Sequence, residues 1–376
     1  MLNYEYPPLG GGAANACHCM LKEFAKKCEI KIDLITSSEK NLFETEQFSD
    51  TITIFKINVK KEYIHHWKMI ELARWTCQTY RLARKMAERN HYDLCHCWFG
   101  WPSGVIGYLL RSKMPYLVAL RGSDIPGYNP RLKIFDSLLF IPLSKIVWKH
   151  ACCVTTNSLN STKMAKKVLN INYKMIHNGI DINEFYPDVR NSNQIRLLSV
   201  GRLTERKNID DIILATKEVH TRYPEKSVHF SIVGSGNQDL YLRNLVHKLG
   251  LEDNISFMGA IPHEKLPAIY RNHDIFILAS KNEALANVTL EAISSGLALL
   301  TTDTGPAELL DNNGYIINTK DYKDIADKIG FLINNPTTLL AFKKQSARIA
   351  SRMTWNNCTD SYINIYKKHF RYNKWN

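Results

Sequence analysis

No stretch of this sequence is apolar for long enough to cross a lipid bilayer. A membrane-spanning helix needs roughly 18 to 20 apolar residues, whereas the longest unbroken apolar run covers only residues 138–143. The first residues also lack a basic region followed by an apolar stretch, which is the pattern of a secretion signal. These absences predict a protein that has no transmembrane helix and stays in the cytoplasm.

A disulfide framework is lacking too. The nine cysteines are scattered, with Cys152 and Cys153 adjacent, which suits a reducing compartment where thiols act as small apolar residues. We therefore expect no disulfides. Two Cys-His-Cys tripeptides begin at Cys17 and Cys95 and could supply zinc ligands. Because neighbouring side chains diverge along a strand or helix, we predict no metal site there.

The sequence also contains no Asp-x-Asp motif, internal repeat or low-complexity segment. Its 376 residues, with 45% hydrophobic content, leave room for two to three domains with hydrophobic cores. A globular multi-domain protein is the expected class.

Acidic residues are scarce in the first half of the chain. Residues 1–180 contain 25 Lys and Arg against 14 Asp and Glu, a surplus of 11, whereas residues 181–376 contain 24 against 22, a surplus of 2. A positive field favours anionic partners, such as nucleic acid, an acidic membrane face or phosphorylated substrates. A basic surface that serves only solubility is the alternative. No nucleic-acid-binding module is recognisable, so we expect no nucleic-acid partner.

Buried-strand patterns alternate with helical patterns in the second half. Short β-branched apolar runs precede longer stretches with apolar residues at helical spacing, which is typical of a parallel sheet covered by helices on both faces. The expected strands are residues 195–201, 229–236, 254–260 and 274–280, and the expected helices are residues 209–223, 242–251 and 265–272.

The first half shows the same alternation of strand and helix patterns, although less clearly. The sequence therefore predicts two doubly wound α/β domains. The first comprises residues 1–176 and the second residues 177–356, joined by turn-forming residues around Asn178 and Gly179. A helical pattern in residues 357–376 follows the second domain, and we expect it to join the first. Strands in the first half are expected at residues 31–37, 51–57, 93–99, 115–122 and 152–157.

Ligands of open α/β sheets bind beyond the carboxyl ends of the strands, where helix N-termini offer free N–H groups. Gly10, Gly11 and Gly12 precede a helix expected to begin near Ala13. Glycine lets a backbone approach a phosphate closely. A flexible turn is the alternative interpretation of this glycine run.

Arg202 and Lys207 follow the first expected strand of the second half. An Arg that grips two oxygens and a Lys that acts as a point charge form a diphosphate clamp. The alternative is a pair of ordinary solvated charges beside Glu205.

Residues 280–305 form the most informative segment. Glu283 lies in the loop after an expected strand, Asn287 is a candidate N-cap, and Glu291 is expected in the first turn of the following helix. A carboxylate at this place can accept two hydrogen bonds from a ribose diol, while the N–H groups of Val288 and Thr289 point at phosphate. Alternatively, Glu291 serves only to complement the dipole at a helix start. This interpretation accounts for Glu291 but not for the other residues of the segment.

Together these segments resemble glycosyltransferase family 4, whose members are retaining enzymes. The family has the GT-B fold, in which two Rossmann-like domains face each other across a cleft. The spacing of Glu283 and Glu291 matches its E-x7-E signature, and similar segments extend from the glycine run to residues 302–310. The resemblance therefore spans nearly the whole chain.

The resemblance implies a role for each candidate residue. Glu291 would hold the nucleotide ribose, Arg202 and Lys207 the diphosphate, and Glu283 would lie near the donor sugar. Gly11 and Gly12 would approach the diphosphate from the first domain. Retention implies same-face attack, with the departing phosphate oxygen accepting the acceptor's proton and the protein stabilising that phosphate.

The implied activity is that of a hexosyltransferase using a UDP- or GDP-sugar as substrate. Because the sequence lacks Asp-x-Asp, we expect a metal-independent reaction with no cofactor. A GT-B epimerase or phosphorylase is the rival interpretation. A dehydrogenase is disfavoured because Asp239 stands where the dinucleotide fingerprint that begins at Gly234 needs Gly or Ala.

Two positions depart from the family pattern. Trp98 stands where the second His of a His-x-His pair that begins at His96 is frequent, and Arg121 replaces another frequent His, near Asp124. We therefore expect an altered acceptor or sugar pocket. Residues 131–150 mix Lys with large apolar residues, which suits a helix at an anionic membrane surface. A buried helix with basic edges is the alternative interpretation. A lipid-linked acceptor in polysaccharide or glycolipid synthesis would be presented there.

Overall fold

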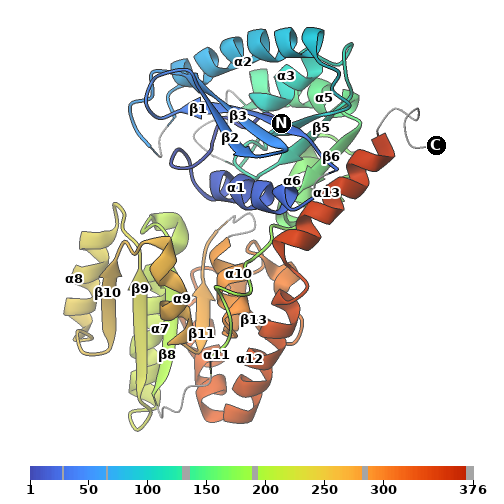
Figure 1. Ribbon diagram of the computed structural model, residues 1–376. Coiled ribbons are helices and arrows are strands. Elements are labelled where there is room, and N and C mark those ends of the chain that lie inside the picture. The colour runs from blue at the N-terminus through green and yellow to red at the C-terminus, as the bar shows by residue number, and fades with distance from the viewer. Residues whose placement is uncertain (28, 65–66, 129–135, 189–193, 282–286, 370–376) are drawn as a thin grey trace. The chain divides into compact units, whose positions relative to one another are not determined.

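The computed structural model describes residues 1–27, 29–64, 67–128, 136–188, 194–281 and 287–369, and the chain divides into two compact units (Figure 1). Unit 1 contains Met1–Asn178 and Trp355–Asn376, and unit 2 contains Gly179–Thr354. The first domain was expected to end at residue 176, and unit 1 ends two residues later, at Asn178. The C-terminal segment was expected to start at residue 357, and unit 1 resumes two residues earlier, at Trp355.

Unit 2 is built on a six-stranded parallel sheet with the order β10-β9-β8-β11-β12-β13. Its strands are nearly continuous apolar runs because helices cover both faces. The strands are β8 (Ile195–Val200), β9 (Val228–Val233), β10 (Ile255–Gly259), β11 (Ile275–Leu278), β12 (Ala298–Thr302) and β13 (Gly314–Ile317).

Two hydrophobic cores flank this sheet. One contains side chains of α7 (Ile209–Arg222), α8 (Asp239–Leu249) and α11 (Tyr322–Asn334). The other contains side chains of α9 (Leu266–Arg271) and α10 (Asn287–Ser294). Helix α12 (Pro336–Ala350) contributes to both cores, and the short turns are η3 (Glu205–Lys207), η4 (His263–Lys265) and η5 (Ala307–Leu309).

The direction of chain progression across the unit 2 sheet reverses at β8. From β8 the chain moves outward through β9 to β10, and β11 then pairs with the other edge of β8. The helices that follow β8 and β11 are α7 and α10, which lie in different cores on the two faces of the sheet, and a ligand-binding crevice is expected at such a switch point. This point is where the sequence places its main candidate residues.

Unit 1 contains a four-stranded parallel sheet and a three-stranded sheet. Leu2 forms parallel bridges to Ile35 and to Cys97, and so links the two sheets. The four strands, in spatial order, are β4 (Cys95–Trp98), β5 (Tyr116–Leu120), β6 (Cys153–Thr156) and β7 (Lys174–Met175). The three are β1 (Ile32–Ser38), β3 (Ile52–Asn58) and the antiparallel edge strand β2 (Glu44–Ser49).

The helices of unit 1 also enclose two cores. One core includes α2 (Met69–Arg89), α3 (Ser103–Leu109), α5 (Ile141–His150) and α6 (Leu159–Val168). The other includes α1 (Gly12–Ala25) and α13 (Trp355–His369), which lie side by side in Figure 1. A π-helical turn, η2 (Asp136–Phe140), leads into α5.

The two α/β halves confirm the fold class expected from the sequence. Of the strands that the pattern missed, β2, β7 and β13 lie at a sheet edge, whereas β12 lies inside the unit 2 sheet. Strand β2 is polar and largely exposed, so its sequence lacks the apolar run by which a buried strand is recognised. None of the helices in the described part of the chain combines the length and apolarity that a bilayer span demands.

Candidate functional site

Two loops meet beyond the carboxyl ends of β8 and β11. The side-chain amide of Asn208, after β8, donates a hydrogen bond to the carbonyl of Ala279 at 2.8 Å. The backbone N–H of Lys281, after β11, donates to the carbonyl of Arg206 at 3.0 Å. These bonds hold the loop after β8 against the segment after β11, at the switch point of the sheet.

Arg202 and Lys207 line a small hollow at the end of β8. Arg202 is exposed and Lys207 is half-buried. A Cβ added to Gly201 would lie 3.7 Å from Nζ of Lys207, so the ammonium group folds back over the glycine. The two cations thus border one hollow, an arrangement that suits a diphosphate clamp. That role stays a prediction.

Gly234 and Gly236 let the loop after β9 approach the loop after β8. A Cβ on Gly234 would lie 1.9 Å from the carbonyl oxygen of Gly201, and one on Gly236 would lie 2.2 Å from that of Leu203. Larger residues at either position would collide with backbone. Close packing between loops therefore explains these two glycines without a dinucleotide.

Glu291 is a buried carboxylate on α10, with 4% of its surface exposed. The hydroxyl of Tyr270 donates a hydrogen bond to Oε2 at 2.8 Å. Nε2 of His263 lies 3.2 Å from Oε1. Sequence reasoning missed both partners, because they lie on α9 and η4 and no local pattern connects them to Glu291.

The start of α10 corrects two expectations. The described part of the helix starts at Asn287, which is itself helical and is therefore not an N-cap. Glu291 is the fifth residue and lies in the second turn, beyond the first-turn region where the helix dipole acts most strongly. Val288 and Thr289 lie at the start of the described part of α10, and contacts of their N–H groups with phosphate stay predictions.

Burial and hydrogen bonding set the titration of the Glu291 partners. Desolvation raises the pKa of the Tyr270 phenol well above its usual value, and the neighbouring carboxylate adds to this shift. The hydrogen bond to Glu291 raises the pKa of His263, although partial burial opposes the shift. Tyr270 therefore stays neutral and donates its hydroxyl proton to the hydrogen bond with Glu291. His263, in contrast, is protonated more readily than a free histidine.

Glu283, the first residue of the E-x7-E pair, lies outside the described residues. The described chain stops at Lys281 and resumes at Asn287. The backbone before the gap is anchored, because the hydroxyl of Thr302 donates to the carbonyl of Ser280 at 2.7 Å. The role of Glu283 near a donor sugar stays a prediction.

The glycine run in unit 1 ends in α1, which begins at Gly12. Gly10 has a φ of +99°, and a Cβ there would lie 2.7 Å from the Cβ of Glu5. An added Cβ on Gly11 would meet nothing within 4 Å, so this backbone faces open space. Burial raises the pKa of Glu5 to about 7, although a hydrogen bond from the Gly11 backbone lowers it. Phosphate contacts of Gly11 and Gly12 stay predictions.

Trp98 and Arg121 stack on each other inside unit 1. The guanidinium carbon of Arg121 lies 4.2 Å from the centre of the Trp98 ring. Nη2 of Arg121 donates to Oδ1 of Asn178 at 2.8 Å. Trp98 is fully buried and also stacks on His96. We therefore expect Trp98 to influence a ligand only through Arg121, rather than by lining an altered pocket.

The histidines of the two Cys-His-Cys tripeptides are bonded to tyrosines. Nδ1 of His96 lies 2.6 Å from the hydroxyl of Tyr366 on α13, and Nδ1 of His18 lies 2.8 Å from that of Tyr6. Burial lowers the pKa of His96 well below its usual value. Among the described residues, no three potential ligands gather where a metal ion could bind.

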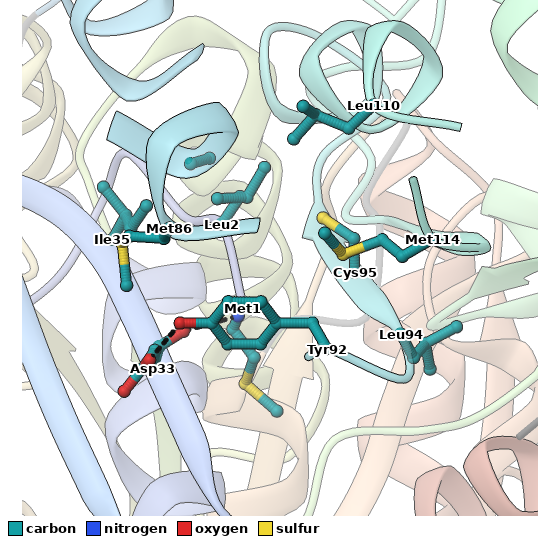
Figure 2. Close-up of a pocket in the computed structure, with 11 residues that line it drawn as sticks. Met1, Leu2, Asp33, Ile35, Met86, Tyr92, Leu94, Cys95, Leu110 and Met114 are labelled. Carbon is teal, nitrogen blue, oxygen red and sulfur yellow. Dashed lines mark hydrogen bonds between the residues drawn. The ribbon is translucent and has the colours of Figure 1, made fainter. Parts of the chain in front are cut away.

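A separate apolar cavity lies in unit 1, at the amino ends of β1, β4 and β5 (Figure 2). Figure 2 shows Tyr92 reaching Asp33, to which its hydroxyl donates a hydrogen bond. Ligands of parallel sheets bind at the carboxyl ends of the strands. None of the residues predicted to bind the nucleotide-sugar donor lines this cavity.

Two family models match adjoining parts of the chain. The model described as glycosyl transferases group 1 matches residues 183–349. The model described as glycosyltransferase family 4 matches residues 10–184. The two matches meet within six residues of the break between units 1 and 2.

Curated relatives match at low identity. An uncharacterized glycosyltransferase of Methanocaldococcus jannaschii is 25% identical, with 98% of this chain and 97% of the relative covered. Mannosylfructose-phosphate synthase of Agrobacterium fabrum is also 25% identical, with 80% of this chain and 74% of the relative covered.

Solved structures share the fold. Sucrose-phosphate synthase from Thermosynechococcus elongatus has a TM-score of 0.81 at 17% identity, with 98% of both chains covered. HepE of Anabaena, solved with UDP-glucose, has a TM-score of 0.71 at 19% identity, again with 98% of both chains covered.

Proposed function

The chain belongs to glycosyltransferase family 4, and from this membership we propose that it transfers a hexose, with retention, from a nucleotide sugar to a sugar or lipid-linked sugar acceptor. The two family models together match residues 10–349. A UDP- or GDP-sugar is the proposed donor, and the UDP-glucose bound to HepE supports the first of these. Cell-surface polysaccharide or glycolipid synthesis is the proposed setting.

Glu291 is the observation that carries the donor half of this proposal. It is a buried carboxylate near the switch point of the unit 2 sheet, held by Tyr270 at 2.8 Å. A buried carboxylate needs hydrogen-bond donors, and a ribose diol supplies two. A carboxylate kept only for structure has no reason to lie where a parallel sheet binds ligands.

Arg202 and Lys207 are proposed to stabilise the leaving diphosphate. In the reaction, the bond from the anomeric carbon to the diphosphate breaks, and the acceptor oxygen bonds to that carbon on the same face. The acceptor proton passes to the departing phosphate oxygen. Negative charge grows on the diphosphate during this step. Arg202 and Lys207, held in position before the reaction, would stabilise that charge and so lower the activation barrier of the transfer.

A transfer assay tests the proposal. Thermal unfolding with UDP-, GDP- and ADP-sugars identifies the donor, because a ligand that binds only the folded state raises Tm. We then expect sugar transfer to an added acceptor with the anomeric configuration kept, and unchanged turnover in EDTA. Phosphorolysis or epimerisation without transfer would contradict the transferase assignment, and loss of turnover in EDTA would contradict metal independence.

The acceptor side is proposed to face an anionic membrane. The predicted segment 131–150 is described from residue 136, where η2 and α5 expose Leu138, Leu139 and Ile146. Lys145 and Lys149 are exposed beside them. Exposed apolar side chains with basic neighbours suit a bilayer that carries acidic lipids.

Substituting the two leucines tests membrane binding. We expect Leu138→Glu/Leu139→Glu to reduce sedimentation with phosphatidylglycerol vesicles at least about tenfold, because two apolar contacts become repelled carboxylates. The matched control is Leu240→Glu, whose position on α8 in unit 2 is similarly exposed (72%, against 78% for Leu138). Equal binding of both variants, or binding insensitive to salt, would contradict the proposal.

A further inference from the structure

Both carboxylate oxygens of Glu291 already have partners, and the two partners differ in freedom. Tyr270, which binds Oε2, is fully buried. Its ring packs against Phe185 and Phe276, with centroids 5.8 Å and 6.0 Å away. Its pKa is held far above neutral by burial. Tyr270 is therefore a fixed donor that has no room to leave Glu291.

His263, which contacts Oε1, is far less constrained. Its side chain is 55% exposed, and it lies on η4, a turn of three residues. Its ring lies near the ring of Phe185, with centroids 5.6 Å apart. A rotation of this side chain into solvent would uncover Oε1 without disturbing buried packing.

Negative charges surround His263. Glu291 faces it from α10, Glu184 from the segment before β8, and Glu264 from its own turn. All three favour the imidazolium form, and the hydrogen bond to Glu291 contributes most to the raised pKa. In the protonated state, the contact with Glu291 is an ion pair reinforced by a hydrogen bond.

We propose that His263 competes with the ribose of the nucleotide-sugar donor for Glu291, so that donor affinity falls when His263 is protonated. This inference rests on the proposed role of Glu291 in holding ribose. A ribose hydroxyl is a neutral donor, and it must replace a charge-assisted bond when His263 carries a proton. When His263 is neutral, the same exchange costs less, so the donor binds more tightly.

The sign of the pH effect follows from the raised pKa. Because Glu291 keeps His263 protonated to a higher pH than a free histidine, competition is strongest below that pKa. Donor affinity should increase as pH rises through the pKa of His263. The diphosphate of UDP-glucose keeps its charge from pH 5.5 to 8.5, so the ligand adds no titration of its own.

Calorimetric titration with UDP-glucose from pH 5.5 to 8.5 tests the inference. For the unmodified protein we expect Kd to fall about twofold to fivefold with rising pH, the scale of a partly exposed ion pair. The Kd of His263→Ala and that of His263→Gln for UDP-glucose should each stay constant across this pH range. At pH 5.5 both variants should bind UDP-glucose more tightly than the unmodified protein. Thermal unfolding confirms that the variants are folded.

His247→Ala is the matched control. His247 is an exposed histidine in the last turn of α8, in the same unit, and its Nδ1 lies 2.6 Å from Oε1 of Glu252. This variant should keep the pH dependence of the unmodified protein. If the loss of any imidazole–carboxylate pair altered the pH dependence of donor binding, His247→Ala and His263→Ala would both show the change.

Three outcomes overturn the inference. A pH dependence that persists in His263→Ala removes His263 as its source. Weaker binding by His263→Ala at every pH would make His263 a direct contact of the donor rather than a competitor. If Glu291→Gln binds the donor as tightly as the unmodified protein, the ribose role itself is wrong, and this result separates failure of the donor site from failure of the competition.

Discussion

Replacing Glu291 with Ala is expected to weaken donor binding by about 100-fold to 10,000-fold. Hydrogen bonds to charged groups contribute about 1.5–3 kcal/mol each, and the ribose diol is proposed to donate two of them. Their joint loss of about 3–6 kcal/mol corresponds to roughly two to four orders of magnitude in Kd. The readouts are Kd by calorimetry and kcat/KM with the donor identified by thermal unfolding.

The controls separate binding from folding. Glu291→Gln keeps the volume of the side chain but lacks one acceptor oxygen and the charge, so we expect most of the loss to persist. Glu264→Ala removes an exposed carboxylate from η4, and its donor Kd should change less than twofold at pH 8. If folded Glu291→Ala binds the donor normally, Glu291 does not hold ribose.

Removing either cation of the hollow after β8 is expected to lower kcat by about 100-fold to 1,000-fold. Arg202→Ala and Lys207→Ala each delete a positive charge that meets the diphosphate as it departs, and the loss of one preorganised donor has this magnitude in other enzymes. The fall should appear mainly in kcat rather than KM, because the charge on the phosphate oxygen grows in the transition state.

Conservative substitutions sharpen this test. Arg202→Lys should recover only part of the activity, since an ammonium group cannot make the two-point contact of a guanidinium. Lys217→Ala serves as control, because Lys217 is an exposed cation on α7 in the same unit. Equal kcat values for Arg202→Ala and Lys217→Ala would show that Arg202 has no role in catalysis.

The neighbourhood of Glu291 marks the limit of sequence reasoning. Glu291 stands out because it follows a strand pattern and lies near a helix start, which are both local features. His263 and Tyr270 lie 28 and 21 residues earlier in the chain. They reach Glu291 only because α9 and α10 pack on the same face of the unit 2 sheet.

Local structure depended on tertiary context in the same way. The sequence favours a helix that begins shortly before Glu291, but α10 begins at Asn287 and buries Leu290, Ala292 and Ile293 against the sheet. Trp98 provides a second case. The family pattern points to a substrate pocket at this position, whereas the indole is buried under Arg121.

The sequence by itself determined the α/β class, the alternation of strands and helices in unit 2, and the family, because buried parallel strands and family motifs are contiguous in the chain. It also identified Arg202, Lys207 and Glu291 as candidates. Only the tertiary structure decided which side chains share the Glu291 carboxylate and where Trp98 lies. The physical reason is that sheet order and helix packing join residues far apart in sequence, and no local periodicity records those contacts.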